Sequence, residues 1–565
     1  MLERKIGVIT KSHQKTTVTE FFELFKTPWS FYQQGLCYDI VIVDQSIEEL
    51  PNGKIILLYS AETRSFDYRN TLNPIQRNKR ILLKQKDLSF PVYQNAVLFN
   101  HPLPSPSNSA FLESVNEGLP ASVCFHLNGK SVIRIGYDLF SEIQFLLSEG
   151  QPAEYAHIPT LDIHISIIRK LVLQSGGFLV EIPPVPYGYS FITCLTHDVD
   201  FIGLKPHKLD KSVLGFIVRG LNPCTARGFG SKIVWKNVFR NWMAILFLPG
   251  VYLGKLNDPW FDIDRYMELE SDTPATFFFM PFKDVPGSSG RLPEPKYRAG
   301  RYDIIHYAEL IQRIRQKGHE IGVHGIDAWH DLLKGDDERM AVIGAANQSQ
   351  AGIRMHWLHY SDESPKILKQ VGYLYDSTRG FNDAIGYKCG TAQVFYSPDA
   401  LPELPLIMMD TALFYPGRMH LPWDSALRKC LSIIADIFRN GGVLTINWHT
   451  RSLMPERNWE EFYTALQDAI HREKSIFMTA HQAVSWFDKR RRTQFESIRV
   501  SDNQLHVTLH SENPFDDPLI FIRIHLPTKS QSKFDLFLDS EYEFIDVPVA
   551  DNNPINVTTG ATSLI

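Results

Sequence analysis

The segment FITCLTHDVDF, residues 191–201, combines an apolar run with two carboxylates at its end. Its apolar and hydroxyl-bearing residues predict a buried β-strand, in which successive side chains point to opposite faces. Thr196, Asp198 and Asp200 therefore share one face, and the two carboxylates project together. Unaided, such a pair would raise the pKa of one carboxyl and cost stability. The spacing predicts a cation between or beside Asp198 and Asp200; two solvated acids at a strand end are the simpler alternative.

Histidines and an arginine stand at other strand-like ends. His324 closes the segment GHEIGVH, and His330 follows six residues later. Arg354 and His356 are two residues apart in GIRMHWL, and His449 follows VLTINW. Imidazole and carboxylate groups are the usual nitrogen and oxygen ligands of zinc-like ions. A single histidine is most often a structural residue, but several polar strand ends in one repeating unit indicate a shared metal site.

Strand-like and helical runs alternate through most of the second half of the chain. This order is typical of a (β/α) barrel or of an open doubly wound sheet. In both folds the carboxyl ends of the strands meet on one face, so the polar residues that end them are expected to gather there. The strand-like runs cover residues 191–201, 275–282, 319–325, 352–358 and 441–450.

These segments resemble motifs of the polysaccharide deacetylase family with the NodB-homology domain. The sequence THDVD, residues 196–200, resembles that of a subset of family members in which one residue separates the two aspartates (D-x-D). The other matches are ATFFF (275–279) to the second strand, GHEIGVH (318–324) to the metal-histidine strand, Arg354 to the arginine element and NWHT (447–450) to the closing histidine motif. The resemblance covers about residues 191–486 and implies an irregular (β/α) barrel.

The resemblance also implies a role for each matched residue. Asp198 would be the catalytic base, and the positive charge of Arg354 would favour and orient its ionised carboxylate. His449, when protonated, would donate to the departing amine or stabilise the oxyanion. Asp200 and His324 would hold a divalent metal ion, expected to be zinc.

The third metal ligand is displaced from its family position. The family spaces its two metal histidines four apart, but the residue four after His324 is Ala328. His330 lies two residues beyond that place, and His356 lies on another predicted strand. Strand alternation would point the side chains of His356 and Arg354 to the same face of the sheet, toward the expected site. This favours His356 as the third metal ligand and leaves His330 as the alternative. Asp410 is a further candidate, for the aspartate that the family places between the arginine and the last histidine.

The resemblance implies a metal-dependent hydrolase that removes N-acetyl groups from an N-acetylated sugar of a polysaccharide or of a lipid-linked glycan precursor. One alternative is a non-catalytic carbohydrate-binding or assembly protein that retains the barrel, and another is a hydrolase of a different amide or ester. Lys388 could reach an anionic substrate group, unless it is a solvated surface lysine. Trp357, Trp423 and Trp448 could stack on sugar faces, unless they pack in the barrel.

Three further regions are expected outside the barrel of residues 191–490. Residues 1–134 predict a small α/β domain with a parallel sheet, and no glycine-rich phosphate loop assigns it a cofactor. Residues 135–190 predict a connecting segment that packs on the barrel, and residues 495–565 predict a β-rich appendage. Within the connecting segment one helical face carries Leu161, Ile165, Ile168 and Val172, and Gly176 is the expected helix end.

Residues 201–256 form a basic insertion in the predicted barrel. They contain nine Lys or Arg residues and a single acid, Asp210. Within them KIVWKNVFRNWMAILFLPGVYLG (232–254) is basic first and apolar afterwards, which is typical of a helix that lies at the surface of an anionic membrane. The apolar part is too short to span a bilayer. The alternative is an extra helical layer that covers the barrel.

The whole-chain composition sets the remaining expectations. The 565 residues are 44% hydrophobic, and the net charge of −5 is not diagnostic of nucleic-acid binding, so we expect no nucleic-acid partner. Neither a signal-peptide core nor a spanning apolar run is apparent. The six cysteines are scattered without metal-knuckle spacing, which favours reduced, buried thiols. We therefore expect a cytoplasmic protein, which the membrane interpretation of residues 201–256 would place at the inner membrane face.

Overall fold

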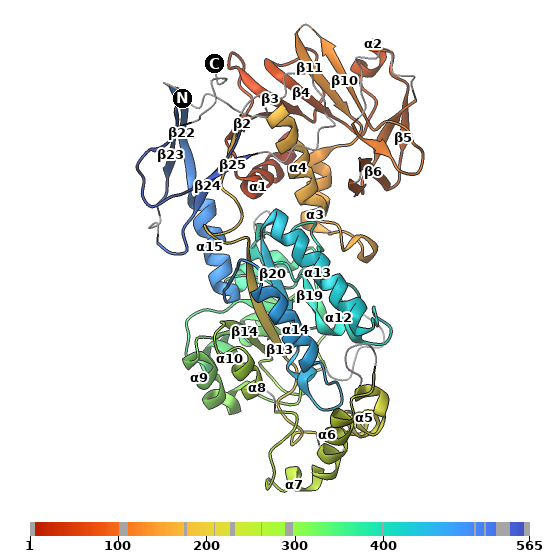
Figure 1. Cartoon of the computed structure of the whole chain (residues 1–565), viewed down its shortest axis with the longest axis vertical. Helices are drawn as coiled ribbons and strands as arrows, with labels where there is room; N and C mark the ends of the chain where they lie inside the picture. Colours follow the sequence, from red (N-terminus) through yellow and green to blue (C-terminus); the bar gives the residue numbers. More distant parts are fainter. Residues whose placement is uncertain are drawn as a thin grey trace.

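The chain is elongated, with an N-terminal sheet at one end, a central α/β body and a projecting group of helices at the other end (Figure 1). The structure is a computed structural model. It describes residues 6–558, apart from residues 87, 101–110, 128, 175–177, 208–209, 227–231, 262, 289–297, 398–399, 502–503, 513–515 and 527–542.

The central body is built on a parallel sheet of seven strands. Its strands follow the order β16-β15-β14-β13-β20-β19, and β21 pairs with the first residues of β13. Every residue of the central strand β13 (Phe191–Val199) is buried, as the apolar sequence predicts. The other strands are β14 (Ala275–Phe279), β15 (Glu320–Gly325), β16 (Ile353–Met355), β19 (Met408–Met409), β20 (Val443–Asn447) and β21 (Ser475–Phe477).

The sheet is an incomplete barrel. Between its edge strands β16 and β19 the chain makes isolated bridges instead of a regular strand: Asp376 pairs with Ile353 on one side and with Glu403 on the other. A short antiparallel pair, β17 (Phe395–Tyr396) and β18 (Pro402–Glu403), lies in the same region. The α/β half-barrel agrees with the predicted class of fold.

Amphipathic helices cover the sheet. Helix α13 (Trp423–Asn440) buries Ala426, Cys430, Ile433 and Ile437, which are spaced three or four residues apart on one face. It ends at Gly441, whose φ of 77° favours glycine. The remaining helices are α8 (Ile263–Leu269), α9 (Ala308–Gln316), α10 (Leu332–Ala346), α11 (Ser364–Val371), α12 (Asp410–Phe414), α14 (Glu460–His471) and α15 (Ala480–Arg492).

The N-terminal region has a six-stranded sheet, which is parallel except for the β10–β11 pair. Its strands are β1 (Ile6–Ile9), β2 (Trp29–Phe31), β3 (Tyr38–Val43), β4 (Gly53–Tyr59), β10 (Ser122–Leu127) and β11 (Lys130–Ile135). Five short strands that the α/β prediction did not include form two small antiparallel sheets. They are β5 (Pro74–Arg77), β6 (Ile81–Gln85), β7 (Leu88–Val92), β8 (Ala96–Phe99) and β9 (Glu113–Ser114).

The helices of the connecting segment pack into the N-terminal core. Leu139 of α3 (Leu139–Ser148) and Ile168 of α4 (Thr160–Gln174) belong to the same apolar cluster as the N-terminal strands and α1 (Lys15–Phe25). Barrel residues Cys389 and Phe395 complete this cluster, so the segment bridges the two regions. The predicted face of α4 is buried, whereas Gly176 lies outside the described residues.

The C-terminal strands form two antiparallel sheets of three strands each. One contains β22 (Gln494–Ser501), β23 (Gln504–His510) and β26 (Ile555–Thr558). The other joins β24 (Phe521–His525) and β25 (Phe544–Pro548) to β12 (Leu179–Glu181), which precedes the barrel in sequence. The appendage is therefore tied to the connecting segment, which periodicity alone did not predict.

The basic insertion forms three helices, α5 (Lys211–Leu221), α6 (Trp235–Leu246) and α7 (Leu248–Tyr252). They project from the end of the molecule opposite the N-terminal sheet (Figure 1). In the described part of the chain, no helix has both the length and the apolar character needed to span a membrane. All six cysteines are described and none forms a disulfide; four are buried as predicted, but Cys37 and Cys224 are exposed.

Candidate active site and metal centre

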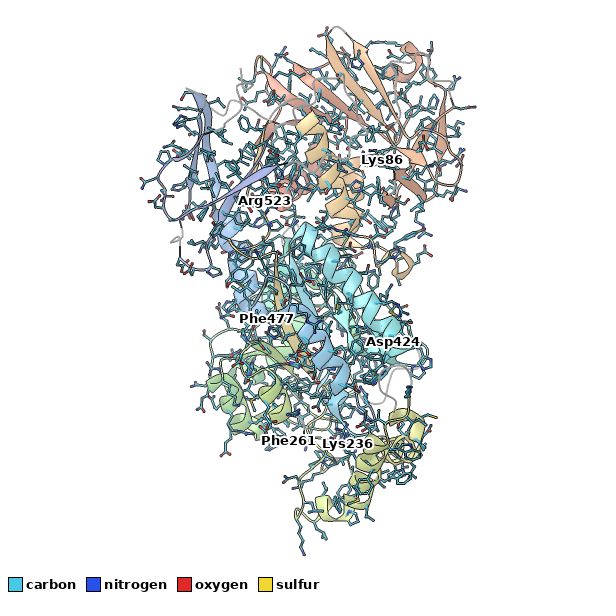
Figure 2. The ribbon with its side chains drawn as sticks, viewed as in Figure 1. Lys86, Lys236, Phe261, Asp424, Phe477 and Arg523 are labelled. Carbon is cyan, nitrogen blue, oxygen red and sulfur yellow. The ribbon has the colours of Figure 1, made fainter. Side chains whose placement is uncertain are left out.

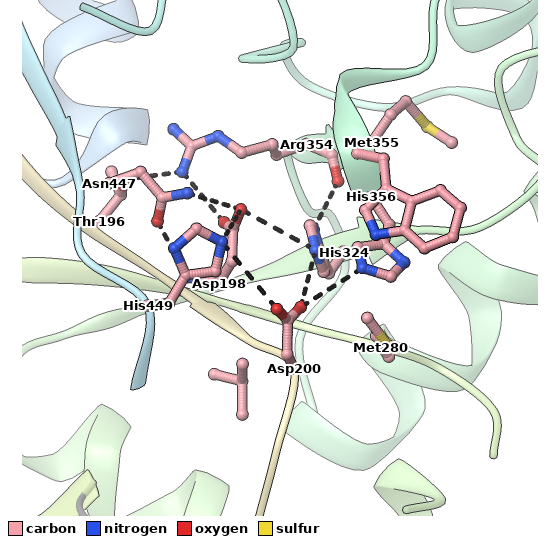
Figure 3. Close-up of polar contacts among 12 residues, drawn as sticks. Thr196, Asp198, Asp200, Met280, His324, Arg354, Met355, His356, Asn447 and His449 are labelled. Carbon is pink, nitrogen blue, oxygen red and sulfur yellow. Dashed lines mark hydrogen bonds and ion pairs between the residues drawn. The ribbon is translucent and has the colours of Figure 1, made fainter. Parts of the chain in front are cut away.

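Four strands of the parallel sheet, β13, β15, β16 and β20, deliver polar side chains to one cavity. Asp198 lies near the end of β13 and Asp200 just after it, and both line the cavity, as strand alternation predicts. His324 lies in β15, Arg354 lies in β16, and His449 follows β20 by two residues. Figure 3 shows these side chains converging from segments far apart in sequence.

The Asp198 carboxylate is held by two neighbouring side chains, Arg354 and Asn447. Arg354 Nη1 donates to Asp198 Oδ1 at 3.1 Å and to Thr196 Oγ1 at 2.7 Å, and Asn447 Nδ2 donates to Asp198 Oδ2 at 2.7 Å. The Arg354 side chain is fully buried and also donates to the backbone oxygen and hydroxyl of Ser377. These contacts leave the Asp198 carboxylate little freedom to rotate, because its two oxygens have different fixed partners.

The charges around Asp198 keep it ionised. Burial would raise the pKa of its carboxyl, but the charges of His324, Arg354 and His449 outweigh burial and lower it. The carboxylate is thus available to accept a proton at neutral pH.

Asp200, His324 and His356 form a cluster suited to a divalent cation. One ligand atom from each lies within 4.8 Å of the others. His324 Nε2 is 3.4 Å from Asp200 Oδ1, and His356 Nε2 is 3.7 Å from the same oxygen. Asp200 Oδ1 and His324 Nε2 are buried and have no hydrogen-bond partner among the described residues. Two buried, unsatisfied atoms facing each other are costly unless a cation lies between them, so the donor set fits a metal ion.

The hydrogen bonding and burial of the two imidazoles also suit metal binding. His324 Nδ1 donates to the backbone oxygen of Arg354 at 3.0 Å, so Nε2 is the ring nitrogen that faces Asp200. Burial lowers the pKa of His356 to about 3, so that ring is neutral at pH 7. For Asp200, burial is outweighed by the neighbouring rings of His324, His356 and His449, which hold its carboxyl pKa well below the usual range. One carboxylate and two imidazoles are typical zinc ligands.

His356 reaches this cluster from a turn. The predicted strand 352–358 is wrong beyond Met355, because residues His356–Leu358 form a 3-10 turn directly after β16. Trp357 adopts a φ of 62° in this turn, and Arg298 Nη2 donates to the His356 backbone oxygen at 3.0 Å. The turn, and not strand alternation, aims the His356 ring at Asp200.

His330, the alternative third ligand, does not join the cluster. It lies in the turn between β15 and α10, where its backbone N–H donates to the Asp327 carbonyl and its Nε2 is 3.6 Å from Asp327 Oδ1. The loop between β15 and α10 directs the side chain to Asp327, which also binds Lys334 at 2.7 Å. The interpretation of His330 as a ligand is therefore corrected.

His449 is oriented by Asp410. The His449 Nδ1 donates to Asp410 Oδ1 at 2.6 Å, and its backbone N–H donates to Asp410 Oδ2 at 2.7 Å. The ring's Nε2 then faces the aspartate pair, 4.0 Å from Asp198 Oδ2 and 3.9 Å from Asp200 Oδ2. Burial would lower the pKa of His449, but Asp410 and the aspartate pair raise it to about 9. The ring is thus protonated at neutral pH and carries its free proton on Nε2.

We expect protonation of His449 to stabilise the metal-free protein, so that its contribution to the melting temperature changes with pH. Its folded-state pKa of about 9 exceeds the ordinary 6.5, so the protonated ring stabilises the fold fully below pH 6.5, and this contribution is lost as pH rises through 9. The shift corresponds to about 3 kcal/mol of unfolding free energy. Melting curves of wild type and His449→Gln should therefore be furthest apart at low pH and should approach each other above pH 9. A gap that does not vary with pH would contradict this account.

The cavity at the site has a volume of about 760 Å³, which lies in the range of small-molecule sites. Trp357 lines it with 45% of its surface exposed. Trp448 and Trp423 are buried in the barrel core instead, and Lys388 donates to the Gln151 backbone oxygen outside this cavity. Of the aromatic residues suggested for sugar stacking, only Trp357 is placed to meet a ligand.

Sequence reasoning missed several residues that hold the site together. Asn447 binds Asp198, Ser377 binds Arg354, and Arg298 fixes the turn that carries His356. Asn447 could have been found, because it lies two residues before His449 on the same strand face. Ser377 and Arg298 lie in irregular segments and give no periodic signal.

Comparisons with known proteins give only distant structural similarity. No family model matches the sequence, and no curated protein matches it. One similar solved structure, from Mycobacterium smegmatis, is described as a polysaccharide deacetylase; it is 18% identical, with a TM-score of 0.33, and the match covers 55% of this chain and 95% of that one. A described polysaccharide deacetylase of Pseudomonas aeruginosa PAO1 is 12% identical, with a TM-score of 0.33 and coverages of 55% and 94%. The peptidoglycan N-acetylglucosamine deacetylase domain of Eubacterium rectale ATCC 33656 is 12% identical, with a TM-score of 0.23 and coverages of 53% and 93%. Scores this low carry no argument about family or activity, so the functional inference rests on the geometry of the site.

Proposed function

We propose that this protein is a metal-dependent hydrolase that removes acetyl groups from an N-acetylated sugar. The observation that carries the proposal is the meeting of three groups at one cavity: an arginine-held aspartate, a carboxylate–imidazole cluster with unsatisfied atoms, and a protonated histidine. Each group has a different chemical use: a base for water, a set of ligands for a Lewis-acidic ion and an acid for the leaving amine, which together suit metal-assisted amide hydrolysis.

Asp198 is the proposed general base. Amide hydrolysis requires water to lose a proton as it attacks the carbonyl carbon. Asp198 is ionised, and Arg354 and Asn447 fix its orientation, so it can take that proton without first turning.

His449 is the proposed general acid. The amine leaves poorly unless it is protonated, and His449 presents a proton on Nε2 because Asp410 occupies Nδ1. Asp410 is a positioning residue, since it orients the ring and raises its pKa without reaching the cavity centre.

Asp200, His324 and His356 are the proposed ligands of a divalent ion, with zinc as the first candidate. Such an ion, when bound, polarises a carbonyl oxygen and lowers the pKa of water. The chain's own contribution is to hold two imidazoles and one carboxylate on the side of the cavity next to the base.

The proposed substrate is an N-acetylated glycan, either a polysaccharide or its lipid-linked precursor. A cavity of this size accepts a sugar unit, and the exposed indole of Trp357 at its wall offers a stacking surface. The rival proposals are a carbohydrate-binding protein without turnover and a hydrolase of another amide or ester.

The test is acetate release by the purified full-length chain after reconstitution with zinc or cobalt. N-acetylglucosamine oligomers and an acetylated xylan should be compared, because the first carries amides and the second esters. Metal-dependent acetate release from the amide substrate supports the proposal. Bound metal without release from either substrate would favour the binding protein, and release from the ester alone would favour an esterase.

A further inference from the structure

The two longer helices of the insertion are apolar on two faces. Their inner faces pack on the body of the protein: Val213 and Phe216 of α5 and Ala244 of α6 share an apolar cluster with Trp260 and Met454. A helical layer that only covers the barrel would need this inner face and no other.

The outer faces of the same helices are also apolar, and they are exposed. In α6, Trp235, Phe239, Trp242 and Leu246 follow helical spacing along one side, and Trp235 and Phe239 are 68% and 63% exposed. Together with the neighbouring turns, the outer surface of the insertion comprises Leu214, Val218, Leu221, Ile233, Trp235, Phe239, Trp242, Leu246, Phe247, Leu253 and Leu256. Exposed apolar residues occur singly on most soluble surfaces, but the stripe along α6, which includes two tryptophans, indicates an interaction site.

The insertion also carries positive charge that is exposed to solvent. Lys205, Lys211, Lys232, Lys236 and Lys255 are exposed, and among the described residues none of them forms an ion pair. The single acid of the insertion, Asp210, is already paired with His207 and Arg301 and caps the start of α5. Figure 2 shows Lys236 on these helices at the projecting end of the molecule. A partner that complements the insertion must therefore offer both an apolar surface and negative charge.

The insertion also forms part of the wall of the cavity. His207 and Asp210, from the loop before α5, and Lys211 and Ser212, from its first turn, line the same cavity as Asp198 and His449. A surface that covered the outer faces of α5 and α6 would therefore lie beside the mouth of the site.

We propose that α5–α7 dock the protein on an anionic phospholipid surface, with the helices lying in the plane of the interface. The tryptophans and leucines enter the boundary between headgroups and acyl chains, while the lysines contact lipid phosphates. A second copy of the chain fits less well, because a symmetric contact through this face would set lysines against lysines. The proposal goes beyond the proposed hydrolysis and does not depend on it; if both hold, docking brings the cavity to the layer where a lipid-linked glycan lies.

The experiment is flotation of the full-length chain with phosphatidylcholine vesicles, with and without phosphatidylglycerol. We expect the protein to float with the anionic vesicles and to remain behind with the neutral ones. High salt should weaken the association, because it screens the lysine–phosphate attraction. Absence of flotation with anionic vesicles at low salt would overturn the proposal.

Matched variants separate docking from a general loss of structure. The pair Trp235→Ser and Phe239→Ser should weaken partitioning about 10-fold or more, since both side chains enter the lipid. The pair Lys232→Gln and Lys236→Gln should weaken it about five-fold for each lysine. As a control, Leu333→Ser removes a 75%-exposed leucine of α10, and it should leave flotation unchanged.

Two further outcomes would refute the proposal. If both insertion pairs bind vesicles as tightly as the wild type while keeping its melting temperature, the insertion is not the docking surface. If sedimentation shows a dimer that the Trp235→Ser and Phe239→Ser pair abolishes, and the wild type does not float, the surface instead joins two copies of the chain.

Discussion

Replacing Asp198 with asparagine is expected to lower the rate of acetate release by about 10²–10⁴-fold, the usual contribution of a general base. The amide keeps the size of the side chain and one acceptor for Arg354, but it cannot take a proton from water. Metal content, measured by atomic emission, should stay the same because Asp198 is not among the clustered ligands. Rates are best measured in the cold, because the fully buried Arg354 loses its counter-charge and the fold is weakened by about 3–5 kcal/mol.

The control for Asp198→Asn is Asp67→Asn. Asp67 and Arg134 form another fully buried carboxylate–guanidinium pair, with Arg134 Nε 2.8 Å from Asp67 Oδ1, but they lie in the N-terminal region. The control should lose similar stability and retain acetate release. Equal losses of activity in both variants would mean that Asp198 acts only through stability, and the role of general base would be rejected.

Replacing His324 or His356 with alanine is expected to weaken metal binding by at least about 100-fold. Mutation of a residue that only hydrogen-bonds to a metal ligand typically lowers metal affinity by about 10–100-fold, so loss of a ligand itself should lower it more. Each variant should also lose the rise in melting temperature that excess metal gives the wild type, because a ligand bound only to the folded state stabilises it. Metal stoichiometry after dialysis, together with thermal melting with and without zinc, checks both effects.

His330→Ala is the matched control for the ligand variants. His330 lies six residues after His324, yet its ring contacts Asp327 outside the cluster. Its removal should leave the metal content at the wild-type level. A variant of His330 that loses the metal, beside a variant of His356 that keeps it, would show that the ligand set is wrong.

Local sequence patterns determined the elements that carry the chemistry. The apolar run before Asp198 predicts a buried strand, and its alternation predicts that Asp198 and Asp200 face one cavity, as they do. The same reasoning placed His324 and His449 at strand ends. These predictions succeed because a strand's side-chain direction is set every second residue by its own backbone.

Tertiary structure decided the contacts that depend on turns and distant segments. His356 is presented by a 3-10 turn that follows a shorter strand than the sequence suggested, and Ser377, which binds Arg354, comes from the irregular side of the barrel. The connecting segment packs into the N-terminal core, and β12 joins strands from the far end of the chain. Such contacts follow from how elements pack in three dimensions, which no local period encodes.

For the basic insertion too, the sequence determined some properties and the tertiary structure determined others. The sequence alone determined that residues 201–256 are basic and contain an apolar run, and it left a membrane surface and a covering layer as alternatives. Only the folded chain shows that the inner faces of α5 and α6 are satisfied by the body of the protein while the outer faces stay exposed. A hydrophobic residue is equally apolar on either side of a helix, so which face meets solvent depends on where the helix packs.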